Sequence, residues 1–141
     1  MIIGVDYSTK YVHFGWLPNQ WRKLRVDEDL LAFTQGIANM LPEHEDGHLY
    51  LERPWARYNA WTGMQMQRIA TIIDVVATQQ GWNVHWTTIA AWRSKLWGKG
   101  KYASKEAKKM ALAYVKEECG LDLTDDNAAD AICLAIYGEM K

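Results

Sequence analysis

The sequence predicts an α/β fold, and three observations indicate it. Residues 1–6 are an apolar run that ends on Asp6, which is typical of a strand covered on both faces. The same pattern recurs at residues 49–52, where Leu-Tyr-Leu runs directly into Glu52. Between and after these runs, apolar residues recur with the period of amphipathic helices. Strands that end on carboxylates are therefore expected to alternate with helices.

Three further strands complete the expected sheet. Residues 11–17 and 20–26 are rich in aromatic and β-branched residues, and Pro18 and Asn19 between them are typical of a turn. These two segments predict an antiparallel hairpin after the first strand. A shorter strand is expected at residues 83–86.

Helical periodicity predicts five helices, over residues 27–41, 62–80, 87–97, 104–119 and 124–137. Ser104 and Thr124 are the expected N-caps of the last two, and Gly120 the expected end of the fourth. The second helix is so apolar that it is expected to lie deep in the domain or to be shared with a second subunit.

Length and composition indicate one cytoplasmic domain. A chain of 141 residues is one domain by the usual prior, here residues 1–141. No apolar run is long enough to span a bilayer, and the N-terminus lacks the features of a signal peptide. We therefore expect a cytoplasmic protein without a membrane partner, in the host cytoplasm if a phage encodes it.

Charge is unevenly distributed although the net charge is only −1. Residues 93–116 hold eight basic side chains against one acid, and residues 117–130 hold six acids and no base. This division suits a protein that binds a polyanion at one surface and metal ions at another. The lysines expected to contact nucleic acid are Lys95, Lys99, Lys101, Lys105, Lys108 and Lys109. A solvated helix face explains the last three equally well.

An aromatic segment follows the second strand-end carboxylate. Trp55, Tyr58 and Trp61 are spaced three apart among Arg53 and Arg57. Aromatic rings interleaved with arginines are suited to stacking on unpaired bases, which contributes about 1 to 3 kcal/mol per base. This favours nucleic-acid contact for Trp55, whereas Tyr58 and Trp61 could equally belong to the core.

Four carboxylates are candidates for one site: Asp6, Glu52, Asp126 and Asp130. Asp126 and Asp130 are one helical turn apart and share a face. Favourable interaction with the helix dipole can explain Asp126, and a turn can explain Asp6, but neither explains Asp130. An all-oxygen ligand set suits Mg²⁺ or Mn²⁺ rather than zinc. Two such ions could activate water and stabilise the leaving oxygen in phosphodiester cleavage.

The order of strands and helices, with carboxylates at these places, resembles the ribonuclease H-like superfamily. The closer resemblance is to the RuvC family of Holliday junction resolvases, including its short bacteriophage forms. It is carried by Gly4-Val-Asp6-x-Ser8-Thr9, Leu51-Glu52, the segment 91–100 followed by Ala103-Ser-Lys105, and Asp126-Asn-Ala-Ala-Asp130-Ala131. The resemblance implies a mixed five-stranded sheet flanked by helices.

The resemblance also implies an activity, namely that of a homodimer that nicks opposed strands of a four-way DNA junction. It implies Mg²⁺, with Mn²⁺ as a substitute and no small-molecule cofactor, and it makes Asp6, Glu52 and Asp130 metal ligands. Family members often carry an acid or histidine where this chain has Asn127. Either Asp126 supplies the missing carboxylate, or Asn127 binds metal through its amide oxygen.

Contacts to the junction are implied as well. Trp55 matches an aromatic position that probes the open junction centre, and Arg57 and Tyr58 follow it. The lysines between residues 95 and 109 match a region that tracks phosphates, which would make the affinity depend on salt.

Three alternatives remain at this stage. A nuclease of the same fold could act on RNA or on an RNA:DNA hybrid. A non-catalytic nucleic-acid binder could carry these acids only as caps and surface charge. The Gly4-Val-Asp6 motif is also similar to the first phosphate motif of sugar kinases and actin-like ATPases, but those proteins need two such domains.

Overall fold

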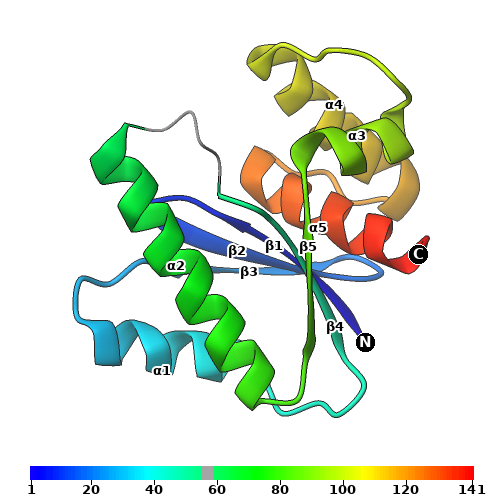
Figure 1. Ribbon diagram of the computed structural model, residues 1–141. Coiled ribbons are helices and arrows are strands. Elements are labelled where there is room, and N and C mark those ends of the chain that lie inside the picture. The colour runs from blue at the N-terminus through cyan, green and yellow to red at the C-terminus, as the bar shows by residue number, and fades with distance from the viewer. Residues whose placement is uncertain (55–58) are drawn as a thin grey trace.

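The computed structural model describes residues 1–54 and 59–141, which form a mixed five-stranded sheet flanked by helices (Figure 1). The sheet order is β3-β2-β1-β4-β5; β1 pairs antiparallel with β2 and parallel with β4. This confirms the predicted fold class. The elements are β1 (Ile2–Tyr7), β2 (Tyr11–Trp16), β3 (Gln20–Arg25), α1 (Leu30–Met40), β4 (His48–Glu52), α2 (Ala60–Gln79), β5 (Asn83–Thr87), α3 (Ile89–Trp97), α4 (Ser104–Cys119) and α5 (Asp126–Glu139).

The two faces of the sheet carry different layers. Helices α1 and α2 cover one face, whereas α3, α4 and α5 lie on the other (Figure 1). Since successive side chains of a strand point to opposite faces, Ile3 and Val5 enter the core under α1 and α2. The residues between and after them, Gly4 and Asp6, face α5. The side chain of Asp6 therefore lies between the sheet and the last helix.

Helix α5 lies in main-chain contact with the sheet. A Cβ atom added to Gly4 would collide with the carbonyl oxygen of Ala131, and one added to Gly15 would lie 2.7 Å from the amide nitrogen of Ile132. Ala128 and Ala131 are fully buried in the same layer. The small side chains of this part of α5 allow such a close approach.

Two expected helix caps are wrong by one residue. The N-cap of α4 is Ala103, and Ser104 is the first helical residue. The N-cap of α5 is Asp125 rather than Thr124, because the Asp125 carboxylate accepts hydrogen bonds from the amides of Asn127 and Ala128. A carboxylate and a hydroxyl are both good caps, so the sequence alone does not decide between neighbours. Gly120 ends α4 in the left-handed conformation, as expected.

Helix α2 buries only one side. Ile69 and Ile73 are buried against the sheet, whereas Trp61, Met64 and Val75 are exposed. Its outer apolar side chains are therefore uncovered. Within residues 1–54 and 59–141, no helix is both long and apolar enough to cross a membrane.

Candidate active site

Asp6 and Glu52 lie side by side at the ends of neighbouring parallel strands. The register of β1 and β4 pairs Val5 with Leu51, and Asp6 and Glu52 are the next residues of each strand. Adjacent strands are about 4.8 Å apart, and both side chains point to the α5 face. The structure thus places the two predicted strand-end carboxylates next to each other on one face of the sheet.

Helix α5 brings the other two carboxylates to the same place. Burial, followed by the negative charges of Asp130, Glu52 and Asp126, raises the pKa of Asp6 well above its ordinary value. Burial and then the charge of Glu52 raise the pKa of Asp130 from 3.8 to about 7. The charges of Glu52 and Asp126 thus act on both Asp6 and Asp130, and the charge of Asp130 acts on Asp6 as well.

Glu52 has two neighbours from α3. Burial raises the pKa of Glu52, while a hydrogen bond from Trp92 and the positive charge of Arg93 partly offset this. The indole Nε1 of Trp92 donates to Oε1 of Glu52 at 2.6 Å. The guanidinium of Arg93 lies over the rings of Trp92 and Trp97, and its buried Nε has no hydrogen-bond partner among the described residues.

The chemistry of this donor set fits a divalent cation. Among the described residues, the one ion pair is His13 with Asp125, so Asp6, Glu52 and Asp130 have no cationic partner within 4.0 Å there. No three His, Cys, Asp or Glu side chains in residues 1–54 and 59–141 converge closely enough to form a ready-made metal cage. Burial and then the negative charges of the carboxylates raise the pKa values of Asp6 and Asp130, and a divalent cation would relieve the repulsion between these charges.

Sequence reasoning missed the role of His13. It is the cross-strand partner of Asp6, it is 3 % exposed, and its Nε2 lies 3.0 Å from Oδ2 of Asp125. The imidazole thereby joins β2 to the start of α5, one residue before Asp126. Counting the register of the first two strands identifies the neighbour of Asp6, but nothing local indicates the bond to α5.

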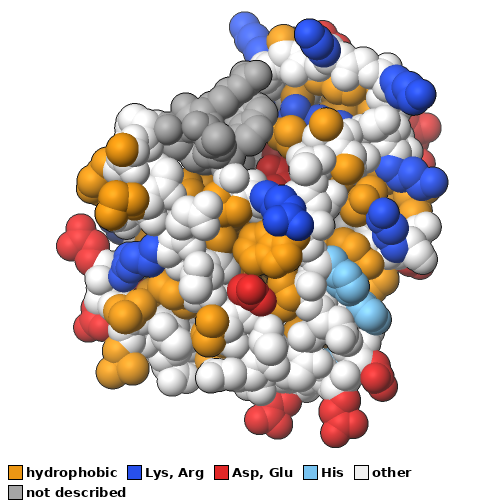
Figure 2. All heavy atoms as spheres, in the orientation of Figure 1, with side chains coloured by type: hydrophobic (Ala, Val, Ile, Leu, Met, Phe, Trp, Pro, Cys, Tyr) orange, Lys and Arg blue, Asp and Glu red, His pale blue; other side chains and the backbone are white. Residues whose placement is uncertain are grey.

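The expected lysines are all exposed and lie on α3, α4 and the loop between them. In Figure 2, blue side chains gather around this part of the molecule. The charge of Lys108 acts on Asp130, so the basic surface reaches the carboxylates. Lys95 lies elsewhere: it lines a pocket with Tyr137 and Lys141, at the opposite end of α5 from Asp126.

The aromatic segment is only partly described. Trp55, Arg57 and Tyr58 lie outside the described residues, so their expected contacts stay predictions. Trp61 is described and is 66 % exposed at the start of α2, which rules out the core alternative for this side chain.

A mixed sheet with carboxylates on adjacent strand ends and on the last helix defines a class, the metal-dependent nucleases of ribonuclease H-like fold. The family model for crossover junction endodeoxyribonuclease RuvC matches residues 3–138. The chain therefore belongs to the RuvC family. By family it is a Holliday junction resolvase, a phosphodiester hydrolase of DNA recombination and repair whose activity depends on a divalent cation.

Solved structures agree with this fold. The structure of Thermus thermophilus RuvC in complex with a Holliday junction substrate has a TM-score of 0.73 at 12% identity, covering 96% of this chain and 90% of that chain. Another structure of RuvC from the same organism has a TM-score of 0.65 at 16% identity, covering 96% of this chain and 91% of that chain. At these identities the likeness establishes the fold. Curated protein sequences contain no match.

Proposed function

We propose that the protein is a Mg²⁺-dependent, homodimeric endonuclease of one domain that nicks opposed strands of a four-way DNA junction, with Asp6, Glu52, Asp126 and Asp130 as its metal-binding and catalytic residues. The observation that carries these assignments is the gathering of carboxylates between β1, β4 and α5, where Asp6, Glu52 and Asp130 form no ion pair with any described residue. Mn²⁺ is expected to substitute, since both ions take oxygen ligands.

Asp6, Glu52 and Asp130 would hold the cation, which, when bound, activates water and stabilises the leaving oxygen. The protein's own part is to position and orient. The sheet fixes two carboxylates at adjacent strand ends, and the main-chain contact of α5 with β1 sets the height of Asp130 above them. We assign the fourth ligand to Asp126 rather than Asn127, since the charge of Asp126 acts on both Asp6 and Asp130 while Asn127 is exposed.

Branched DNA is the proposed substrate, bound along α3 and α4. The exposed lysines of α4 and of the loop before it would contact phosphates, and the charge of one of them, Lys108, acts on Asp130; they are Lys99, Lys101, Lys105, Lys108 and Lys109. Lys95, at the other end of α5, would contact a more distant part of the same arm. Trp55, Arg57 and Tyr58 follow Glu52 directly in the sequence, and we propose them as contacts to unpaired bases at the junction centre.

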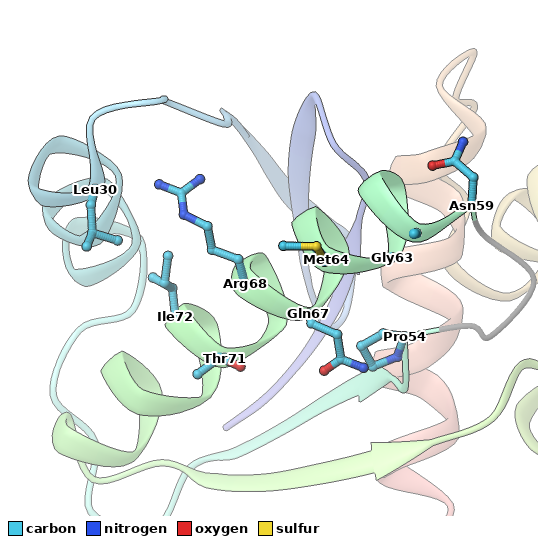
Figure 3. Close-up of a pocket in the computed structure, with 10 residues that line it drawn as sticks. Leu30, Pro54, Asn59, Gly63, Met64, Gln67, Arg68, Thr71 and Ile72 are labelled. Carbon is cyan, nitrogen blue, oxygen red and sulfur yellow. The ribbon is translucent and has the colours of Figure 1, made fainter.

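A second copy of the chain is the proposed partner of the outer side of α2. A groove of about 750 Å³ lies between this helix and the start of α1. In Figure 3, Leu30 from α1 and Met64, Arg68 and Ile72 from α2 surround it. Leu30 and Met64 are more than half exposed, and apolar surface at one place favours an interface. Two subunits would place two sites on two opposed strands, as paired nicking requires.

The test is cleavage of a labelled synthetic four-way junction with and without Mg²⁺. The wild type is compared with Asp6→Asn and with Asp46→Asn, a matched change of an exposed carboxylate in the loop before β4. A linear duplex and an RNA:DNA hybrid are run in parallel, and sedimentation gives the oligomeric state. We expect symmetric nicks from the wild type and Asp46→Asn, and none from Asp6→Asn or without metal.

Other outcomes contradict the proposal in distinct ways. Cutting of the hybrid but not of the junction would replace the DNA substrate with RNA. If the wild type binds the junction in Mg²⁺ without cutting it, the proposed catalytic site is wrong. If a monomer still makes paired nicks, the proposed dimer is wrong.

A further inference from the structure

The side chain of Glu52 accepts a short hydrogen bond from a tryptophan. Nε1 of Trp92 lies 2.6 Å from Oε1 of Glu52, and the Trp92 side chain is completely buried. The two residues are forty positions apart in the chain. They meet because α3 begins directly after β5, with Thr88 as its N-cap, and β5 pairs with β4.

The indole that donates this bond is tightly fixed. The ring of Trp97 packs edge-on against it at 5.1 Å, and the ring of Tyr102 packs edge-on against Trp97 at 5.4 Å. The hydroxyl of Tyr102 donates to the carbonyl oxygens of Trp97 and Gly98. A donor held by interlocked rings loses little entropy in making its bond, so its direction is set before any ligand arrives.

An indole N–H has particular consequences for a carboxylate. It donates one hydrogen bond, carries no charge and accepts nothing. It therefore fixes Oε1 without bringing a positive charge to Glu52. A lysine or arginine in its place would bring one. Oε2 has no hydrogen-bond partner among the described residues. The hydrogen bond thus leaves one carboxylate oxygen of Glu52 without a partner among the described residues, and hard cations take such oxygen ligands.

We propose that Trp92 is a positioning residue that orients Glu52 for a divalent cation through the indole N–H. This inference rests on the proposed function of Glu52 as a metal ligand. Hydrogen bonds to metal ligands typically change metal affinity by about 10- to 100-fold.

The test uses Trp92→Phe, which removes the N–H and keeps an aromatic ring. Trp97→Phe is the matched control, because it makes the same change in the same ring cluster, where the buried Nε1 of Trp97 has no partner among the described residues. Mn²⁺ binding is measured without DNA from the electron paramagnetic resonance signal of the free ion. The Mn²⁺ dependence of junction cleavage gives a second readout.

We expect Mn²⁺ to bind Trp92→Phe about tenfold more weakly than the wild type, with Trp97→Phe within about twofold of it. Cleavage by Trp92→Phe should need correspondingly more Mn²⁺ while the KM for the junction stays unchanged. If Trp92→Phe fails to fold, as judged by circular dichroism, benzothienylalanine at this position replaces the N–H by sulfur in a ring of the same shape.

Several results would overturn the inference. Equal Mn²⁺ affinity in the wild type and Trp92→Phe, with normal cleavage by both, would remove the role of Trp92 and leave the proposed function intact. An equal loss in Trp92→Phe and Trp97→Phe would reduce the effect to general packing. A wild type that binds no Mn²⁺ would overturn both the inference and the metal site.

Discussion

Replacing Asp130 with Asn should stabilise the metal-free protein at alkaline pH. In the folded protein, burial and the charge of Glu52 raise the pKa of Asp130 to about 7. The unfolded chain ionises near the ordinary value of 3.8, so between these values the unfolded state releases a proton that the folded state keeps. The stability of the metal-free wild type therefore falls as pH rises from about 4 to about 7, and the neutral amide removes this contribution.

The size of the effect follows from the shift. About three pKa units at about 1.4 kcal/mol each give a loss near 4 kcal/mol once pH exceeds 7. About 3 kcal/mol of this falls between pH 5 and pH 8, and partial solvent access to Asp130 makes it an upper bound. After burial, the charge of Asp130 is the largest cause of the raised pKa of Asp6. Asp130→Asn removes this charge and should therefore lower the pKa of Asp6 as well.

The assay is urea unfolding in a chelator at pH 5 and pH 8, with Asp122→Asn as the control, since Asp122 is an exposed carboxylate before α5. From pH 5 to pH 8, the unfolding free energy of the wild type and of Asp122→Asn should fall by the same amount. The fall for Asp130→Asn should be smaller by about 2 to 3 kcal/mol. Mg²⁺ should stabilise the wild type at pH 8 and have less effect on Asp130→Asn. Equal losses in all three proteins would refute the electrostatic description of the site.

Three further predictions concern the fold and the DNA surface. Gly4→Ala should cost about 3 kcal/mol or more in urea unfolding, because its Cβ meets main-chain atoms of α5, whereas Gly36→Ala, which meets only the flexible side-chain end of a leucine, should stay within about 1 kcal/mol. His13→Gln should cost about 1 kcal/mol at pH 6. Burial raises the pKa of Asp125, but the charge and hydrogen bond of His13 and the hydrogen bonds of two backbone amides lower it by more, to below its ordinary value. The stability that these interactions supply is lost as pH falls below 4. The difference in unfolding free energy between His13→Gln and the wild type should therefore narrow there. Lys99→Ala should reduce the slope of log Kd against log salt for junction binding by about one, and an unchanged slope would exclude a phosphate contact.

Much of the site could be predicted because its residues follow local patterns. An apolar run that ends on an acid identifies both Asp6 and Glu52, since the residue that follows the buried part of a strand lies at the end of that strand. Asp130 stands among alanines, and small residues on a helix indicate close approach to a neighbour. The structure brings these positions together because β1 and β4 are parallel and α5 packs across them.

The supporting residues could not be predicted in the same way. Trp92 reaches Glu52 across forty positions, and His13 reaches Asp125 across 112. Such pairs depend on strand register, on helix rotation and on which of two neighbouring caps is used, and none of these is fixed by local sequence pattern. Exposure of Trp61 also depends on how α2 is rotated on the sheet, since its sequence is apolar on more than one side.

The contact of α5 with Gly4 and Gly15 makes the spacing of the carboxylates a property of the main chain. Side-chain packing can relax by rotamer changes, whereas two backbones already in contact have no closer or intermediate arrangement to adopt. The position of the helix therefore fixes the distance between the backbones of Asp130 and Asp6. A glutamate at position 130 would keep the charge but place its carboxylate one methylene farther from the helix backbone. The length of each acidic side chain is therefore as much a part of the site as its charge.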